Sequence, residues 1–218
     1  MSSLLLKDGD RFLFQGDSIT DAGRRSPEWA PWGLGYPAIA RGLLMAQAPG
    51  LQVEFFNRGI GGDTTVEMEA RWEEDCLELR PTWMSVLIGI NDVWRFLELD
   101  RKETGPEFFG PRYEALLSRA VETTGCRLLL IEPFLWAAPA AEPVYTWQRP
   151  AETEFLAMYR ETTRALAEKF DALFVPAQAI GDAIISAQGS GFLCAEPVHP
   201  NLTGHAVLAQ HLVAALQG

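Results

Sequence analysis

The chain has 218 residues, of which 48% are hydrophobic and 22% are charged, and its formal net charge is −11. This length suits one domain with a core that needs no disulfide or metal to be stable, so we expect residues 1–218 to form a single domain. The acidic balance argues against nucleic acid, whose phosphates require a basic face, and against binding to anionic membranes.

Cysteine usage and hydropathy point to a cytoplasmic location. Three cysteines, Cys76, Cys126 and Cys194, lie far apart and form no Cys-x-x-Cys pair, which is typical of reduced thiols. The apolar run near the N-terminus is too short for a secretory signal. No stretch approaches the roughly 20 apolar residues of a membrane span.

Apolar runs and helical periodicity alternate along the chain. We predict strands at 11–15, 51–57, 82–88, 126–131 and 173–175, and helices at 36–48, 65–79, 106–124, 152–170, 178–187 and 202–216. Residues 95–105 and 133–150 are expected to be irregular. The alternation implies parallel βαβ units with right-handed crossovers. We therefore predict an α/β fold, a three-layer α/β/α sandwich with a flavodoxin-like, doubly wound, five-stranded parallel sheet.

Four distinctive residues follow predicted strands or precede the last helix. Ser18 follows the first strand, Gly62 the second and Asn91 the third, and His199 precedes the final helix. A parallel sheet brings such positions to one edge. Together with Glu196, three residues before the histidine, they include a nucleophile, a base, an acid and oxyanion donors, which is the set that acyl transfer needs.

Each of these residues also has a purely structural interpretation. Gly16-Asp17-Ser18 and Asn91-Asp92 are residue types that favour turns. Gly62 can be an ordinary loop glycine, and His199 an ordinary surface residue. The occurrence of all of them in one order favours catalysis over four separate turns.

The same residues carry a family resemblance. Gly16-Asp17-Ser18-Ile19-Thr20, Gly62, Asn91 and the segment 196–199 resemble the four sequence blocks of the SGNH (GDSL) hydrolases. Segments 16–23, 71–75 and 88–95 are similar to the intracellular acetylxylan esterases of this superfamily. The resemblance implies a serine esterase in which Ser18 attacks the ester carbonyl and His199 is general base and then general acid. It implies an oxyanion hole formed by the backbone N–H groups of Ser18 and Gly62 and the side-chain amide of Asn91, and it implies a homo-oligomer.

One residue departs from the family pattern. The SGNH hydrolases have aspartate three residues before the histidine, whereas this chain has Glu196. The longer side chain leaves three outcomes: the loop shifts so that Glu196 still binds Nδ1 of His199, a backbone carbonyl orients the imidazole instead, or the enzyme is weak or inactive. We expect the first outcome.

Aromatic residues near the expected catalytic edge suggest the substrate. Trp29, Trp32, Trp94, Trp136 and Trp147 can stack on sugar rings or can simply anchor their loops. We expect Asp17 to brace the turn through backbone N–H groups, and we include it with Trp29, Trp32 and Trp94 as a candidate substrate contact.

We expect hydrolysis of short-chain acetyl esters on a carbohydrate such as xylo-oligosaccharides. A lysophospholipase or thioesterase on the same scaffold is an alternative, and so is a non-catalytic carbohydrate-binding protein with a degenerate site. The chain has no dinucleotide fingerprint after its first strand and no His-x-His or carboxylate cluster, so we expect no cofactor and no metal.

Overall fold

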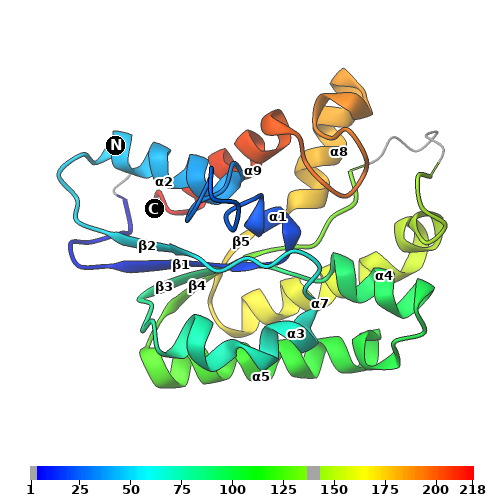
Figure 1. Cartoon of the computed structure of the whole chain (residues 1–218), viewed down its shortest axis with the longest axis horizontal. Helices are drawn as coiled ribbons and strands as arrows, with labels where there is room; N and C mark the ends of the chain where they lie inside the picture. The colour runs from blue at the N-terminus through cyan, green and yellow to red at the C-terminus, as the bar shows by residue number, and fades with distance from the viewer. Residues whose placement is uncertain (1–3, 137–142) are drawn as a thin grey trace.

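The computed structural model describes residues 4–136 and 143–218. Five parallel strands form one sheet in the order β2-β1-β3-β4-β5, which confirms the flavodoxin-like topology (Figure 1). The strands are β1 (Arg11–Gly16), β2 (Glu54–Asn57), β3 (Trp83–Leu87), β4 (Arg127–Ile131) and β5 (Leu173–Val175). The α-helices are α1 (Ser18–Asp21), α2 (Tyr36–Gln47), α3 (Thr65–Ala70), α4 (Ile90–Glu98), α5 (Pro106–Thr124), α6 (Gln148–Pro150), α7 (Leu156–Lys169), α8 (Ala177–Gln188) and α9 (Leu202–Ala215).

Helices cover both faces of the sheet. Helices α2, α8 and α9 lie on one side, and α3, α5 and α7 lie on the other (Figure 1). Because both faces are covered, the central strands are largely apolar, and Phe12, Leu13 and Phe14 of β1 have no exposed surface. None of the helices in residues 4–136 and 143–218 is both long and apolar enough to cross a membrane.

The secondary structure of two segments near the candidate site differs from the prediction. The single helix expected at 65–79 is divided into α3 and a π-helical turn, η1 (Glu73–Leu77). The segment 95–105, expected to be irregular, contains the C-terminal part of α4 (Ile90–Glu98) and a short 3₁₀ turn, η2 (Lys102–Thr104). Apolar residues at 90, 93, 94 and 97 give α4 its buried side, and the charged residues between them obscured that pattern.

Smaller differences concern the ends of elements. Strand β2 begins at Glu54 rather than 51, and a second π-helical turn, η3 (Ala151–Phe155), precedes α7. The segment expected to be a loop at 133–150 contains α6, and its residues 137–142 lie outside the described residues. A 3₁₀ turn, η4 (Ser190–Phe192), lies between α8 and α9.

Candidate active site

The first strand delivers Ser18 to the carboxyl edge of the sheet. Strand β1 ends at Gly16, and Ser18 is the first residue of α1. The intervening Asp17 caps that helix, because its Oδ1 accepts a hydrogen bond from the N–H of Ile19 at 3.0 Å. Gly16 has φ of +153°, and a Cβ on it would lie 2.3 Å from the carbonyl oxygen of Leu87 on β3. Only glycine therefore allows this turn to pack against the neighbouring strand.

Ser18, His199 and Glu196 are joined by hydrogen bonds although the first two are 181 positions apart. Ser18 Oγ lies 2.9 Å from His199 Nε2, and His199 Nδ1 lies 2.5 Å from Glu196 Oε1. Glu196 also accepts the backbone N–H of His199 at 2.7 Å and that of Val198 at 3.0 Å. The loop thus curls around the longer carboxylate, and this geometry is the first of the three outcomes considered for Glu196.

The pairing changes the pKa values of both partners. The hydrogen bond to Glu196 raises the pKa of His199 above its usual 6.5, although partial burial opposes this effect. Burial by itself would raise the pKa of Glu196, but the hydrogen bonds from His199 and Val198 outweigh burial and the net pKa is lowered. The carboxylate therefore stays ionised, and the imidazole becomes a stronger base toward Ser18.

Gly62 lies in a loop that β1 and α1 hold in place. The N–H of Ile60 donates to the carbonyl of Gly16 at 3.1 Å, and the N–H of Gly61 donates to Asp21 Oδ2 at 3.0 Å. Gly62 has φ of +87°, a left-handed conformation that disfavours other residues. A Cβ placed on Gly61 would lie 3.8 Å from the Cβ of Ser18, so this loop passes directly beside the serine.

Asn91 is on the first turn of α4, whereas the sequence suggested a loop. Its side chain is 8% exposed, and Nδ2 donates one hydrogen bond to the carbonyl of Asp63 at 3.0 Å. An amide nitrogen carries two hydrogens, so the second is available to another acceptor. Because Asp63 directly follows Gly62, this bond links the Asn91 amide to the loop at residues 59–62, which we call the glycine loop.

Two hollows lie beside the Ser18–His199 pair, one lined by His199 and the other by Ser18. A cavity of about 220 Å³ is lined by Asn91, Trp94, Tyr145, Trp147, Val198 and His199. The rings of Tyr145 and Trp147 are stacked with centroids 6.3 Å apart. A more open hollow of about 310 Å³ is lined by Ser18, Asp21, Ala22, Gly23, Arg25, Ser26 and Gly61. The hollow on the His199 side of the pair is strongly aromatic, and the hollow on the Ser18 side is more open.

The other candidate substrate contacts do not line the aromatic cavity. The Asp17 side chain is 1% exposed and faces the N–H of Ile19, so it braces the turn rather than lining the surface. Trp29 is 48% exposed, and Trp32 packs beneath the guanidinium of Arg41, 4.7 Å from the ring centroid. Trp136 is 1% exposed in the core, where Nε1 donates to the carbonyl of Ala177 at 2.9 Å. For Trp136 the packing interpretation holds.

Sequence reasoning did not identify Tyr145 and Val198 as cavity residues. Val198 adjoins His199 and could have been found from that position, whereas Tyr145 lies in a segment without helical or strand periodicity. Among residues 4–136 and 143–218, no group of three or more His, Cys, Asp or Glu side chains is placed to hold a metal ion.

The sequence belongs to a known family. A model of the GDSL-like lipase/acylhydrolase family matches residues 14–207, which is most of the chain and includes Ser18, Gly62, Asn91 and His199. The chain is therefore a member of the GDSL-like lipase/acylhydrolase family and is a carboxylic ester hydrolase.

Acetylxylan esterases are among its similar proteins. The acetylxylan esterase of Geobacillus stearothermophilus is 34% identical over 208 residues, which cover 93% of this chain and 91% of the esterase. A crystal structure of that esterase matches with a TM-score of 0.85 at 31% identity and covers 99% of this chain and 97% of the esterase chain. A Parabacteroides merdae structure assigned as a GDSL-like lipase matches with a TM-score of 0.88 at 32% identity and covers 97% of each chain.

Catalytic mutants of the Geobacillus esterase have been solved at a serine, an acidic residue and a histidine, which are the kinds of residue found at Ser18, Glu196 and His199. The solved mutants replace a serine, an aspartate and a histidine by alanine, and that aspartate and histidine are three positions apart. Glu196 and His199 have the same spacing in this chain.

Proposed function

We propose that this protein is an esterase that removes acetyl groups from xylo-oligosaccharides, with Ser18, His199 and Glu196 as its catalytic triad. The observation that carries the proposal is the chain of contacts from Ser18 Oγ to His199 Nε2 at 2.9 Å and from His199 Nδ1 to Glu196 Oε1 at 2.5 Å. A nucleophile, a base and an orienting acid in this relation are the arrangement that activates serine for acyl transfer.

The proposed reaction begins with transfer of the Ser18 hydroxyl proton to Nε2 of His199 as Oγ attacks the acetyl carbonyl carbon. The imidazolium that forms keeps its Nδ1–H directed at Glu196, whose ionised carboxylate stabilises the positive charge. His199 then donates the Nε2 proton to the leaving sugar oxygen, which leaves an acetyl-serine. A water molecule, deprotonated by His199, attacks that ester and releases acetate and free Ser18.

Three donors would stabilise the negative oxygen of each tetrahedral intermediate. They are the N–H groups of Ser18 and Gly62 and the second amide hydrogen of Asn91. Donors that are already oriented need no rearrangement as charge develops, and removal of one typically costs about 3–4 kcal/mol of transition-state stabilisation.

The shape of the site supports a short acyl group on a sugar. The aromatic cavity of about 220 Å³ has Trp94, Tyr145 and Trp147 on its wall, and flat ring faces suit the apolar faces of pyranose rings. The volume of this cavity lies below the roughly 300–1,000 Å³ of typical pockets for larger ligands, which favours a small substrate group over a long acyl chain. The Geobacillus relative is described as an acetylxylan esterase and as an acetyl-xylooligosaccharide esterase, which favours the same substrate here.

A hydrolysis panel tests the proposal. Acetylated xylo-oligosaccharides are compared with acetyl, butyryl and octanoyl esters of one chromogenic alcohol, and Ser18→Ala is the control. We expect the acetylated sugars and the acetyl ester to have the highest kcat/KM, with no turnover by Ser18→Ala. A preference for octanoyl esters would favour the lysophospholipase or thioesterase alternative. No labelling of the wild type by a fluorophosphonate would favour the non-catalytic carbohydrate-binding alternative.

Location and assembly are further parts of the proposal. Three buried free thiols, Cys76, Cys126 and Cys194, support a cytoplasmic site of action, where thiols stay reduced. A homo-oligomer is proposed on the family resemblance of the sequence alone. Fractionation of the source cells tests the location, and light scattering coupled to size-exclusion chromatography tests the assembly.

A further inference from the structure

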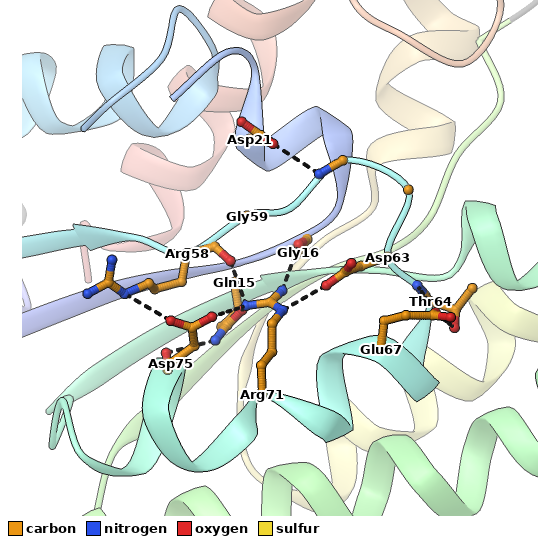
Figure 2. Close-up of polar contacts among 12 residues, drawn as sticks. Gln15, Gly16, Asp21, Arg58, Gly59, Asp63, Thr64, Glu67, Arg71 and Asp75 are labelled. Carbon is orange, nitrogen blue, oxygen red and sulfur yellow. Dashed lines mark hydrogen bonds and ion pairs between the residues drawn. The ribbon is translucent and has the colours of Figure 1, made fainter. Parts of the chain in front are cut away.

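Arg71 belongs to a sequence segment, 71–75, that the proposed chemistry does not use. It directly follows α3, and its side chain is only 14% exposed. In Figure 2 the guanidinium of Arg71 lies at the centre of a set of polar contacts, with Gly16 on one side, Asp63 on another and Asp75 on a third. Each of these partners comes from a different element or loop.

One contact reaches the strand that carries the serine. Arg71 Nη2 donates to the carbonyl of Gly16 at 3.3 Å, two positions before Ser18. The same carbonyl accepts the N–H of Ile60 at 3.1 Å. Arg71 therefore contacts the turn of β1 at the point where it meets the glycine loop.

Two further contacts bracket that loop. Arg71 Nη1 donates to the carbonyl of Arg58 at 2.7 Å, and Nε donates to Asp63 Oδ2 at 2.7 Å (Figure 2). These two residues lie on either side of the segment 59–62, which ends at Gly62. The backbone carbonyl of Asp63 accepts the Asn91 amide at 3.0 Å. One guanidinium thus contacts Asp63, which adjoins Gly62 and accepts the Asn91 amide, and Gly16, which lies two residues before Ser18.

The ion pairs that Arg71 forms require an arginine at this position. Asp63 and Asp75 both pair with the guanidinium, at 2.7 and 3.0 Å, and Asp75 also pairs with Arg58 at 3.3 Å. A guanidinium presents five N–H donors in a rigid plane, which lysine cannot reproduce from a single ammonium. Substitution by lysine keeps the charge but cannot satisfy acceptors on three sides at once.

We propose that Arg71 is a positioning residue that fixes the Gly62 loop and the Asn91 amide against the Ser18 turn, and so sets the geometry of the oxyanion hole. This inference rests on the proposed function. It goes beyond the triad, because Arg71 acts through backbone carbonyls and through Asp63 rather than by touching substrate. The positions it holds determine where the three donors point.

The test compares Arg71→Lys with a matched control, Arg112→Lys. Arg112 has 17% side-chain exposure and also joins a carboxylate to a backbone carbonyl, with Nε 3.2 Å from Glu69 Oε2 and Nη1 2.8 Å from the Glu103 carbonyl. These partners lie outside the catalytic loops. Each variant is assayed for thermal midpoint, for kcat and KM on an acetyl ester, for the Ki of phenylboronic acid, and for the rate of fluorophosphonate labelling of Ser18.

We expect Arg71→Lys to lower kcat and the labelling rate by about 10- to 100-fold, because small misplacements of catalytic groups have effects of this size. KM should change little. The Ki of phenylboronic acid, whose adduct occupies the oxyanion hole, should rise by a factor similar to the loss of kcat. Arg112→Lys should retain wild-type kcat even where its thermal midpoint falls. Arg71→Lys with wild-type kcat and labelling rate per folded molecule would overturn the proposal, since a purely structural residue affects only the amount of folded protein.

A second pair of variants applies if Arg71→Lys does not fold. Asp63→Asn and Asp75→Asn each remove one ion-pair partner of Arg71, but only Asp63 adjoins Gly62 and accepts the Asn91 amide. We expect Asp63→Asn to slow labelling by about tenfold and Asp75→Asn to slow it less than twofold. Equal effects of the two variants would contradict the proposal.

Labelling also separates this inference from the proposed function. A wild-type protein that is labelled at Ser18 but does not hydrolyse acetyl esters would overturn the substrate assignment, and the Arg71 comparison would still be decided by labelling rates. A wild-type protein that is not labelled would overturn both proposals.

Discussion

Glu196 Oε1 contacts His199 at two atoms, since it lies 2.5 Å from Nδ1 and 2.7 Å from the backbone nitrogen. The carboxylate thereby orients the ring and the backbone of the same residue. The extra methylene of glutamate, relative to the aspartate of the family pattern, is accommodated by the turn at 196–199. The imidazole can therefore hold its Nδ1–H toward Glu196 while Nε2 faces Ser18 at 2.9 Å.

Glu196→Gln should lower kcat by about 10²- to 10⁴-fold, because a neutral amide does not stabilise the imidazolium and can hold the wrong tautomer. Steady-state kinetics at saturating acetyl ester measure the loss, and circular dichroism confirms folding. A rate within about twofold of wild type would remove Glu196 from the triad.

The pH dependence of kcat/KM should report the same pair. His199 must be neutral to accept the Ser18 proton, and its pKa is raised by Glu196, so activity should be lost as the pH falls through a value above 6.5. In Glu196→Gln this acid limb should move to lower pH, because the raising partner is gone. An acid limb at the same pH in both proteins would show that Glu196 does not control the titration of His199.

Asn91→Ala should lower kcat by about 10²- to 10³-fold with little change in KM, as expected for loss of a donor that acts mainly in the transition state. Asn91→Asp keeps the shape of the side chain, but the ionised form has no donor and should be similarly slow. Thermal unfolding controls for loss of the Asn91–Asp63 hydrogen bond. Near-wild-type turnover in either variant would exclude Asn91 from the oxyanion hole.

Asp17 should make the protein less stable as the pH rises from about 4 to about 7. Burial raises its pKa from 3.8 to about 7, so over this range the folded protein holds a proton that the unfolded chain has lost. Asp17→Asn keeps an oxygen that can accept the Ile19 N–H but does not titrate. Relative to wild type, this variant should therefore be more stable at pH 8 than at pH 5. Urea unfolding at the two pH values provides the measurement, and a difference independent of pH would contradict the buried carboxyl.

Gly181→Ala should destabilise the fold by about 1–3 kcal/mol, which is typical of overpacking a filled core. A Cβ on Gly181 of α8 would lie 2.1 Å from Nε1 of Trp136, whose backbone N–H also donates to the carbonyl of Pro197. The control is Gly42→Ala on α2, where a Cβ would meet nothing within 4 Å. Gly42→Ala should stabilise by about 0.5–1 kcal/mol, because alanine is the better helix former. Equal free energies of unfolding for the two variants would contradict the packing described for Trp136.

Much of the fold could be predicted because strands buried on both faces must be apolar throughout, and the segments that became β1, β3 and β4 are nearly continuous apolar runs. Helix α4 could not be predicted in the same way. Its charged residues at 92, 95 and 98 interrupt the apolar ones, although Asp92 is itself buried, and the local pattern resembled an irregular segment. The break between α3 and η1 also escaped prediction, since a π-helical turn has no sequence signature comparable to proline or glycine.

Ser18, Gly62, Asn91 and His199 could be identified as candidates without coordinates, because each residue type has a definite role in acyl transfer and each follows or precedes an element of a parallel sheet. Whether Glu196 reaches His199 depended on the path of the 196–199 turn, which residue types alone do not specify. The contacts of Arg71 were decided only by tertiary structure. Its acceptors are backbone carbonyls, carboxylates and the side-chain amide oxygen of Gln15, from β1, from the glycine loop and from η1. No local periodicity records which distant oxygen a buried guanidinium will face.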